Sequence, residues 1–193
     1  MGLITSVPNI CIIGLGNPDL KYSGTRHNIG KDWIERITKD FNLDLQSKKK
    51  IESTVVKSSD EKILWGYPNN YVNESGQSIS KIIKNTNINL ENIIVIHDDL
   101  DLPIGSLKIK VGGGHGGHNG LRSIISHSGK SFIRLRVGIG HPGNKVDVTK
   151  WVLGKFKLTE RDAVLRNFHK FNNIIELLSN NDIQNAQLKL HSE

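Results

Sequence analysis

Two short, continuous apolar runs place the strongest constraint on how this chain folds. Residues 10–15 enter a turn rich in glycine and proline, and residues 93–96 end in a run of acidic side chains. Runs of this length bounded by turn signals are typical of buried strands. Segments with helical apolar spacing separate them, so strand and helix alternate along the chain. This alternation predicts an α/β fold with a mixed, largely parallel sheet.

Other apolar patterns locate the remaining elements. Helical spacing predicts helices over roughly residues 28–41, 79–83, 121–125 and 164–178, with Thr159 as the N-cap of the last. Residues 48–56 and 62–67 are expected to form a hairpin. Period-two alternation predicts strands at residues 107–111 and 133–137, each with one apolar and one cationic face.

Length and composition indicate one globular domain. Of the 193 residues, 36% are hydrophobic and 23% are charged, so residues 1–193 are expected to share one core, with residues 1–8 as a loose tail. The single cysteine, Cys11, can form neither an internal disulfide nor a cysteine-based zinc site. The sequence shows neither an export signal nor an apolar run of membrane-spanning length. These features predict a cytoplasmic protein without membrane contact.

The charge balance narrows the class of partner. A net charge of +7 and a pI of about 9.5 favour a polyanion such as nucleic acid. Many basic proteins bind no nucleic acid, so charge alone does not choose the function.

Two glycine-rich segments are candidate ligand sites. Gly14-Leu15-Gly16 follows a strand, but Asp19 stands where a dinucleotide motif requires its third glycine, and Pro18 interrupts the turn. A plain turn is therefore favoured there. The loop at residues 112–120 lacks the Gly-Lys-Ser/Thr ending of a P-loop. Its glycines permit close approach of the backbone to a ligand, whereas the alternative is a mobile connector between strands.

His115, His118, Asp98 and Asp99 are potential metal ligands. The two histidines lie on a glycine loop without fixed mutual spacing, and adjacent aspartates in an extended segment point to opposite faces. Metal motifs are specific because their ligands are spaced on regular structure. No metal site is therefore expected.

His27 lies between the first strand and the first helix. Together with Asn17 and Asp98, it is expected near the carboxyl ends of sheet strands, where open α/β folds bind ligands. The alternative is an ordinary polar surface histidine. A histidine oriented by an aspartate is the minimum machinery for activating water, so the three residues predict a hydrolytic site.

Six longer motifs occur in one order between residue 10 and about residue 156. They are Gly14-Leu15-Gly16-Asn17-Pro18, Thr25-Arg26-His27-Asn28, Tyr71-Val72-Asn73-Glu74-Ser75-Gly76, His97-Asp98-Asp99-Leu100-Asp101-Leu102-Pro103, residues 112–120, and Arg134-Leu135-Arg136-Val137-Gly138-Ile139-Gly140-His141-Pro142. Together they resemble the bacterial peptidyl-tRNA hydrolase family. The resemblance implies a monomeric α/β domain with a twisted mixed sheet. It also implies hydrolysis, without a cofactor, of the ester that joins peptide to tRNA in peptidyl-tRNA released prematurely from ribosomes.

The resemblance assigns roles to individual residues. His27 is implied to be the general base acting on water, and Asp98 to tune and orient it. Lys110 and Arg136 are implied to hold the terminal phosphate of the tRNA, in agreement with the cationic strand faces. The implied substrate-binding residues are Asn17, Tyr22, Tyr71, Asn73 and Asn119.

Two positions depart from the usual pattern of that family. Val72 stands where the family usually has Met, and it is expected to shorten an apolar wall of the peptide-binding cleft. Asp19 stands where the family commonly has Gly, and it places a negative charge close to a turn that faces nucleic acid. Neither change removes a group that performs chemistry.

Two other functions remain open from the sequence. A non-catalytic RNA-binding module fits the charge, but only 6% of residues are aromatic, and readers of single-stranded RNA often stack bases on aromatic side chains. A metal-dependent phosphodiesterase would use the region of Asp98.

Overall fold

The computed structural model describes residues 6–144 and 146–192. Its strands are β1 (Ile10–Gly14), β2 (Gln46–Lys48), β3 (Ser53–Lys57), β4 (Ile63–Pro68), β5 (Ile93–Asp99), β6 (Leu107–Val111) and β7 (Ile133–Gly138). Its α-helices are α1 (Ile29–Asp40), α2 (Ser75–Thr86), α3 (Asn119–Ser128), α4 (Val148–Val152), α5 (Leu158–Asn172), α6 (Ile175–Ser179) and α7 (Ile183–His191). The short 3₁₀ helices are η1 (Leu20–Tyr22), η2 (Arg26–Asn28), η3 (Lys49–Ile51), η4 (Val72–Glu74) and η5 (Leu90–Asn92).

All seven strands belong to one mixed sheet in the order β2-β3-β4-β1-β5-β7-β6. The central pairings β4-β1, β1-β5 and β5-β7 are parallel. The outer pairings β2-β3, β3-β4 and β6-β7 are antiparallel. The α/β class and the mixed sheet are confirmed, but parallel pairing is confined to the centre. The expected hairpin forms β3 and β4, and a short connection of this kind reverses the chain direction.

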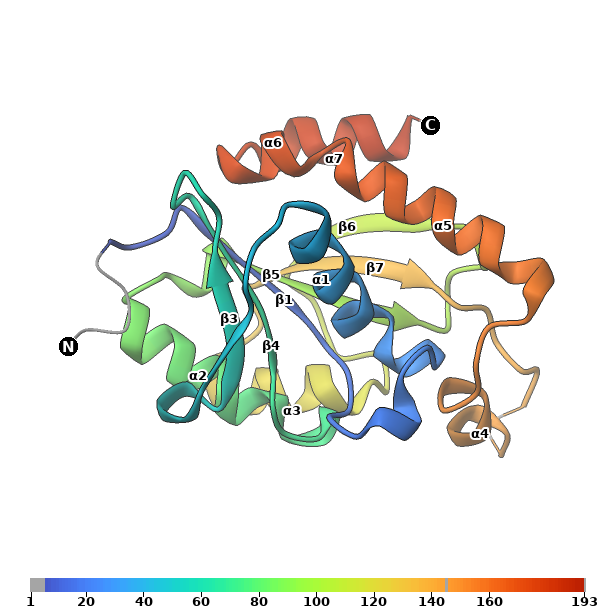
Figure 1. Cartoon of the computed structure of the whole chain (residues 1–193). Coiled ribbons are helices and arrows are strands. Elements are labelled where there is room, and N and C mark those ends of the chain that lie inside the picture. Colours follow the sequence, from blue (N-terminus) through green and yellow to red (C-terminus); the bar gives the residue numbers. More distant parts are fainter. Residues whose placement is uncertain (1–5, 145, 193) are drawn as a thin grey trace.

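Helices cover both faces of the sheet (Figure 1), as the strand burial requires. Along β1, Ile10 and Ile12 belong to one core, under α1, α5, α6 and α7, while Cys11 and Ile13 belong to the other, with α2 and α3. Successive strand residues point to opposite faces, so a continuous apolar run supplies both cores. No described helix has the combined length and apolar character of a membrane span.

Close packing brings the start of α1 to the end of β1. A Cβ atom on Gly14 would lie 2.1 Å from the Gly30 carbonyl oxygen, and one on Gly30 would lie 2.3 Å from the Ile96 carbonyl oxygen. These contacts explain the need for glycine and support the interpretation of residues 14–16 as a plain turn. His27, in η2 just before α1, thereby lies within hydrogen-bonding distance of Asp98 near the carboxyl end of β5.

The ends of the chain differ in two details from expectation. Helix α5 begins at Leu158, so Thr159 lies inside it, and the Glu160 carboxylate accepts the Lys157 backbone N–H at 2.8 Å. The N-cap is therefore Lys157 and not Thr159, and the Glu160 carboxylate satisfies the backbone N–H of that N-cap residue. At the other end, Lys57 donates to the Ser6 carbonyl at 2.8 Å and Pro8 is buried, whereas residues 1–5 of the expected tail lie outside the described residues.

Candidate active site

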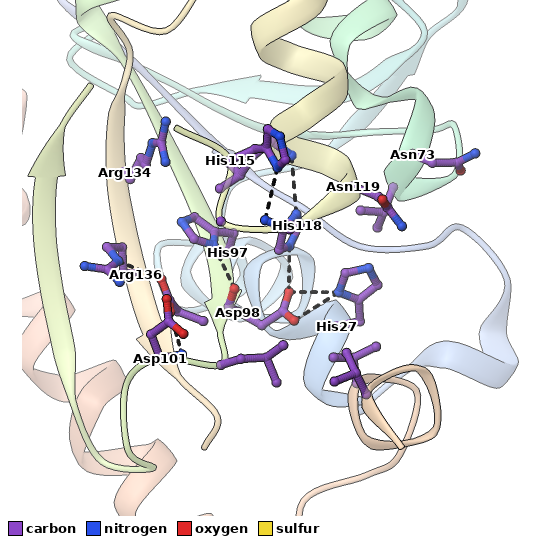
Figure 2. Close-up of a pocket in the computed structure, with 18 of the residues that line it drawn as sticks. His27, Asn73, His97, Asp98, Asp101, His115, His118, Asn119, Arg134 and Arg136 are labelled. Atoms are coloured by element: carbon purple, nitrogen blue, oxygen red, sulfur yellow. Dashed lines mark hydrogen bonds and ion pairs between the residues drawn. The ribbon is translucent and has the colours of Figure 1, made fainter. Parts of the chain in front are cut away.

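A cavity of about 430 Å³ opens at the carboxyl end of β5. Its walls come from η2, the end of β5, the loop at residues 114–118, strands β6 and β7, and α4 (Figure 2). Every site residue expected from the sequence lines it, except the two tyrosines. The expected residues in the wall are Asn17, His27, Asn73, Asp98, Lys110, Asn119 and Arg136.

Asp98 and His27 are hydrogen-bonded to each other in this cavity. The Nδ1 atom of His27 lies 2.9 Å and 3.0 Å from the two carboxylate oxygens of Asp98. A hydrogen bond to a carboxylate requires the proton on Nδ1, so the neutral ring carries its lone pair on Nε2. That nitrogen points away from Asp98, on the side of Asn119 and Asn73 (Figure 2).

His118 is a second histidine partner of Asp98. Its Nδ1 accepts the backbone N–H groups of Gly120 and Leu121 at 3.1 and 3.3 Å, so it is the N-cap of α3. Its Nε2 must therefore carry the proton, which it donates to Asp98 at 3.0 Å. From the sequence, His118 was considered only as a potential metal ligand. Its place directly before the helix start was the signal for this capping role.

The charges of this cluster shift the pKa values of Asp98 and His27. Burial of Asp98 favours its neutral form, but the two histidines and their hydrogen bonds outweigh burial and hold the pKa of this carboxyl well below its usual range. Burial of His27 opposes its charged form, yet the Asp98 charge and hydrogen bond together raise the pKa of His27 above its ordinary 6.5. Asp98 is therefore ionised and stabilises an imidazolium at His27.

His97 supports the cluster from behind. It is buried, its Nδ1 lies 2.7 Å from the Asp98 carbonyl oxygen, and its ring packs edge-on to the ring of His118 at 5.2 Å. Burial and the neighbouring His118 lower the pKa of His97 to about 3. His97 therefore stays neutral and acts as a packed support for His118.

Asn17 is held with its amide group in a defined orientation. Its Oδ1 accepts the Val72 backbone N–H at 3.1 Å, which fixes the identity of the oxygen and leaves Nδ2 as a free donor at the cavity. The Asn28 side chain binds both backbone groups of Asn17, accepting at 2.9 Å and donating at 3.0 Å. Asn28 was part of a quoted motif, but its positioning role was not recognised from the sequence.

Asn73 and Asn119 are exposed at the cavity wall near His27 (Figure 2). Asn73 lies in η4, and Asn119 is the first residue of α3. The Asn119 Oδ1 accepts from Arg122 at 3.2 Å, which orients its amide nitrogen away from that helix turn. The structure thus brings together three asparagine amides from three separate segments.

The two expected tyrosines lie outside the cavity wall. The Tyr71 hydroxyl donates to the Asp19 carboxylate at 2.8 Å, and the Lys21 ammonium lies 3.6 Å from the same carboxylate. Lys21 also lies 4.9 Å from the centre of the Tyr22 ring. Asp19 therefore has both a cationic partner and a hydroxyl donor, so its negative charge is partly neutralised within this cluster.

Cationic side chains of β6 and β7 form the other end of the cavity. Arg136 donates from Nε to Asp99 at 2.6 Å, and Lys110 is exposed. Arg134, opposite Lys110 in the strand pair, is buried and donates to the carbonyls of Gly113 and Gly114. The expected cationic face exists, but Arg134 is used to hold the glycine loop in place.

The potential metal ligands are grouped differently from what the sequence predicted. Asp98 and Asp99 bind different partners, yet both line the same cavity. Potential ligand atoms of His27, Asp98 and His118 lie within 4.8 Å of one another. The two histidine nitrogens in this group carry the protons that bind Asp98, so hydrogen bonding accounts for the cluster.

Arg26 fixes the backbone that carries His27. Its buried guanidinium lies 2.8 Å from Glu160, donates to the Lys155 carbonyl at 2.9 Å and lies 3.8 Å from the centre of the Trp151 ring. These contacts tie η2 to α4 and α5. The sequence motif contained Arg26 without indicating this anchoring role.

Comparison with known proteins agrees with the geometry of the site. The sequence model of the peptidyl-tRNA hydrolase family matches residues 11–193. The chain is 45% identical to a peptidyl-tRNA hydrolase of Aliarcobacter butzleri, over 92% of this chain and 96% of that protein. It is 42% identical to one of Rickettsia canadensis, over 94% and 99% of the two chains.

A solved structure shows the same fold. The crystal structure of peptidyl-tRNA hydrolase from Acinetobacter baumannii superposes with a TM-score of 0.90 at 36% identity, over 96% of this chain and 95% of that one. The resemblance seen in the sequence motifs is thus confirmed over nearly the whole chain. This chain belongs to the peptidyl-tRNA hydrolase family.

Proposed function

We propose that this protein hydrolyses the ester between peptide and tRNA in peptidyl-tRNA, and so recycles tRNA released prematurely from ribosomes. The observation that carries the proposal is the His27–Asp98 pair, at 2.9 Å, with the second ring nitrogen of His27 left free beside three asparagine amides. This arrangement fits ester hydrolysis, because it holds a base and neutral hydrogen-bond donors around one reaction centre.

In the proposed reaction, a water molecule attacks the carbonyl carbon of the peptide's last residue. The Nε2 atom of His27 takes one proton from that water as the new C–O bond forms. The bond to the ribose oxygen then breaks, and the proton passes from the imidazolium to the leaving ribose oxygen. Asp98 stabilises the transient imidazolium by its charge and by its two contacts with Nδ1.

The asparagine amides stabilise the oxyanion and hold the substrate in this proposal. Amide nitrogens donate hydrogen bonds without titrating near neutral pH. Asn17 is well prepared for this role, because its oxygen already accepts from the Val72 N–H and its Nδ2 remains a donor. Asn73, Asn119, Tyr22 and Tyr71 bind the rest of the substrate.

Lys110 and Arg136 hold the terminal phosphate of the tRNA. Both line the cavity on β6 and β7, at its cationic end. A guanidinium and an ammonium together neutralise a phosphate through short charge-assisted hydrogen bonds. Asp99 at 2.6 Å keeps Arg136 oriented before substrate binds.

The enzyme acts as a monomer in the cytoplasm in this proposal. The residues assigned above lie around one cavity of a single chain, which supports a monomeric enzyme. Peptidyl-tRNA arises where ribosomes work, and the buried thiol of Cys11 suits a reducing compartment.

The decisive experiment incubates purified protein with peptidyl-tRNA and resolves the products. Release of free peptide and intact tRNA supports the proposal. Cleavage of the RNA chain would favour a phosphodiesterase, and binding without any cleavage would favour an RNA-binding module.

Chelation tests the absence of a metal from this mechanism. We expect turnover to survive an excess of EDTA, because His27 and His118 use their Asp98-facing nitrogens as hydrogen-bond donors and not as ligands. Loss of activity with EDTA and its return with zinc or magnesium would overturn the roles assigned to these residues.

A further inference from the structure

A second cavity, of about 400 Å³, lies between α1, the start of α5 and the loop at Ser23 and Gly24. None of the residues that line it lines the cavity of His27. Its volume falls within the roughly 300–1,000 Å³ of ligand-binding pockets. The hydrolysis proposed above makes no use of this site.

The wall of the second cavity offers flat surfaces for a ring. The Arg36 guanidinium lies 4.5 Å from the centre of the Phe168 ring, which supports it from the core side, while the Arg36 side chain is half exposed. Phe156 adds a partly buried aromatic ring to the same wall. Nucleic acid bases stack on such guanidinium planes and aromatic rings.

Two further cations in the wall form no close ion pair, although the charge of Lys155 acts on Asp32 at longer range. Lys155 and Arg161 are exposed, and no carboxylate among the described residues lies within 4.0 Å of either side-chain charge. The neighbouring carboxylates are already engaged: Asp40 faces Arg36 at 4.0 Å, Glu160 binds Arg26, and Asp32 accepts the Gly24 N–H at 2.9 Å. The cavity therefore combines an apolar, planar wall with exposed positive charge.

We propose that this second cavity binds a nucleotide, with the base against Arg36 and Phe156 and the phosphate between Lys155 and Arg161. The phosphate complements the two unpaired cations, and the base covers apolar surface that water otherwise contacts. A free nucleotide and an unpaired nucleotide of an RNA share this chemistry. The proposal stands independently of the proposed esterase activity.

Isothermal titration of the full chain tests the site, with AMP, adenosine and inorganic phosphate as separate ligands. AMP is expected to bind at least tenfold more tightly than either fragment, because base and phosphate contribute together. Lys155→Ala combined with Arg161→Ala should weaken AMP binding about tenfold or more. Arg36→Gln should weaken AMP and adenosine but leave phosphate affinity unchanged.

Two matched variants identify the cavity that is responsible. Lys110→Ala removes a cation from the first cavity, and Lys157→Ala removes an exposed cation that lines neither. Lys157→Ala should bind AMP like the unmodified protein, binding that depends on Lys155 and Arg161 should persist in Lys110→Ala, and circular dichroism should show that all variants are folded. Absence of AMP binding at millimolar concentration overturns the proposal. Loss of binding in Lys110→Ala, with binding kept in the double variant, overturns it as well.

A short single-stranded oligoadenylate then separates the two sources. If it competes with AMP, depends on Lys155 and Arg161, and binds more tightly, the natural ligand is an unpaired RNA nucleotide. If AMP binds more tightly, or the oligonucleotide ignores both substitutions, the ligand is a free nucleotide.

Discussion

Asp98 and Lys110 line the same cavity in very different surroundings. Asp98 is buried, and its carboxylate receives hydrogen bonds from His27 and His118. Lys110 is exposed, and no carboxylate among the described residues lies within 4.0 Å of its ammonium. One end of the cavity is thus organised before substrate binds, and the other keeps a cation available to solvent.

This difference separates two uses of charge. Burial strengthens each electrostatic contact of Asp98, but it also makes a buried charge or polar group without a partner costly in free energy. The positions of Asp98 and its two histidine partners are therefore fixed by the hydrogen bonds among them. The exposed lysine requires no such network, but salt screens its interactions over about 8–10 Å. Changes at the Asp98 end should therefore alter the chemical step, and changes at the Lys110 end should alter binding and its dependence on salt.

The largest effect is expected from His27→Ala. Removal of the general base should lower kcat for peptidyl-tRNA by about 10² or more, with binding of peptidyl-tRNA retained. Single-turnover kinetics and an equilibrium binding assay measure the two quantities separately. His115→Ala is the matched control, because its Nδ1 contacts only the Gly117 N–H at 3.0 Å. Near-normal turnover in His27→Ala, with loss in His115→Ala or His118→Ala, would place the base on the glycine loop.

A smaller loss of turnover is expected from Asp98→Ala, since Asp98 acts through His27. Asp98→Asn adds a test by pH. Neutral His27 is the active form, so kcat/KM should fall as the pH drops through the His27 pKa, which Asp98 raises above 6.5. Without the carboxylate charge only burial remains, and burial lowers this pKa, so the inflection should move below 6.5. An unchanged inflection in a folded Asp98→Asn protein would contradict the assigned coupling.

At the cationic end, Lys110→Ala and Arg136→Ala should each weaken tRNA binding and reduce its salt dependence. Each lost phosphate contact lowers the log-log slope by about 0.7 on a single strand. Arg136→Ala should weaken binding more, because it also leaves the Asp99 carboxylate without its partner at 2.6 Å. A small ester substrate should be affected less than peptidyl-tRNA. Lys84→Ala, exposed on α2, is the control; the same slope in all three variants would place the phosphate elsewhere.

The smallest effect is expected from Val72→Met. Val72 is buried at the cavity wall, and its backbone N–H, which holds Asn17, is unchanged by the substitution. A flexible thioether should extend the apolar wall and change KM more than kcat. Steady-state kinetics with peptides of different size check this. A large loss of kcat at unchanged affinity would show that Val72 positions Asn17 more strictly than expected.

Much of the site was accessible from the sequence because motifs and strand ends are local features. The apolar runs at residues 10–15 and 93–96 predicted central strands, and their ends located Asn17 and Asp98. Helix α1 lies within about one residue of its expected bounds, since amphipathic spacing reports which face is buried. The positions of His27 and Asp98 at strand ends had already indicated a histidine–aspartate pair. The resemblance to the family motifs then added the other residues of the cavity wall.

Tertiary structure decided what depends on contacts between distant segments. The His118 proton that reaches Asp98 follows from capping α3, and the burial of Arg134 follows from its contacts with the carbonyls of Gly113 and Gly114. The Tyr71–Asp19 hydrogen bond joins residues 52 positions apart, outside the cavity where Tyr71 was expected. Periodicity records which face of an element is buried, but not which group it meets. Protonation, partner and distance are therefore fixed only when the sheet brings these segments together.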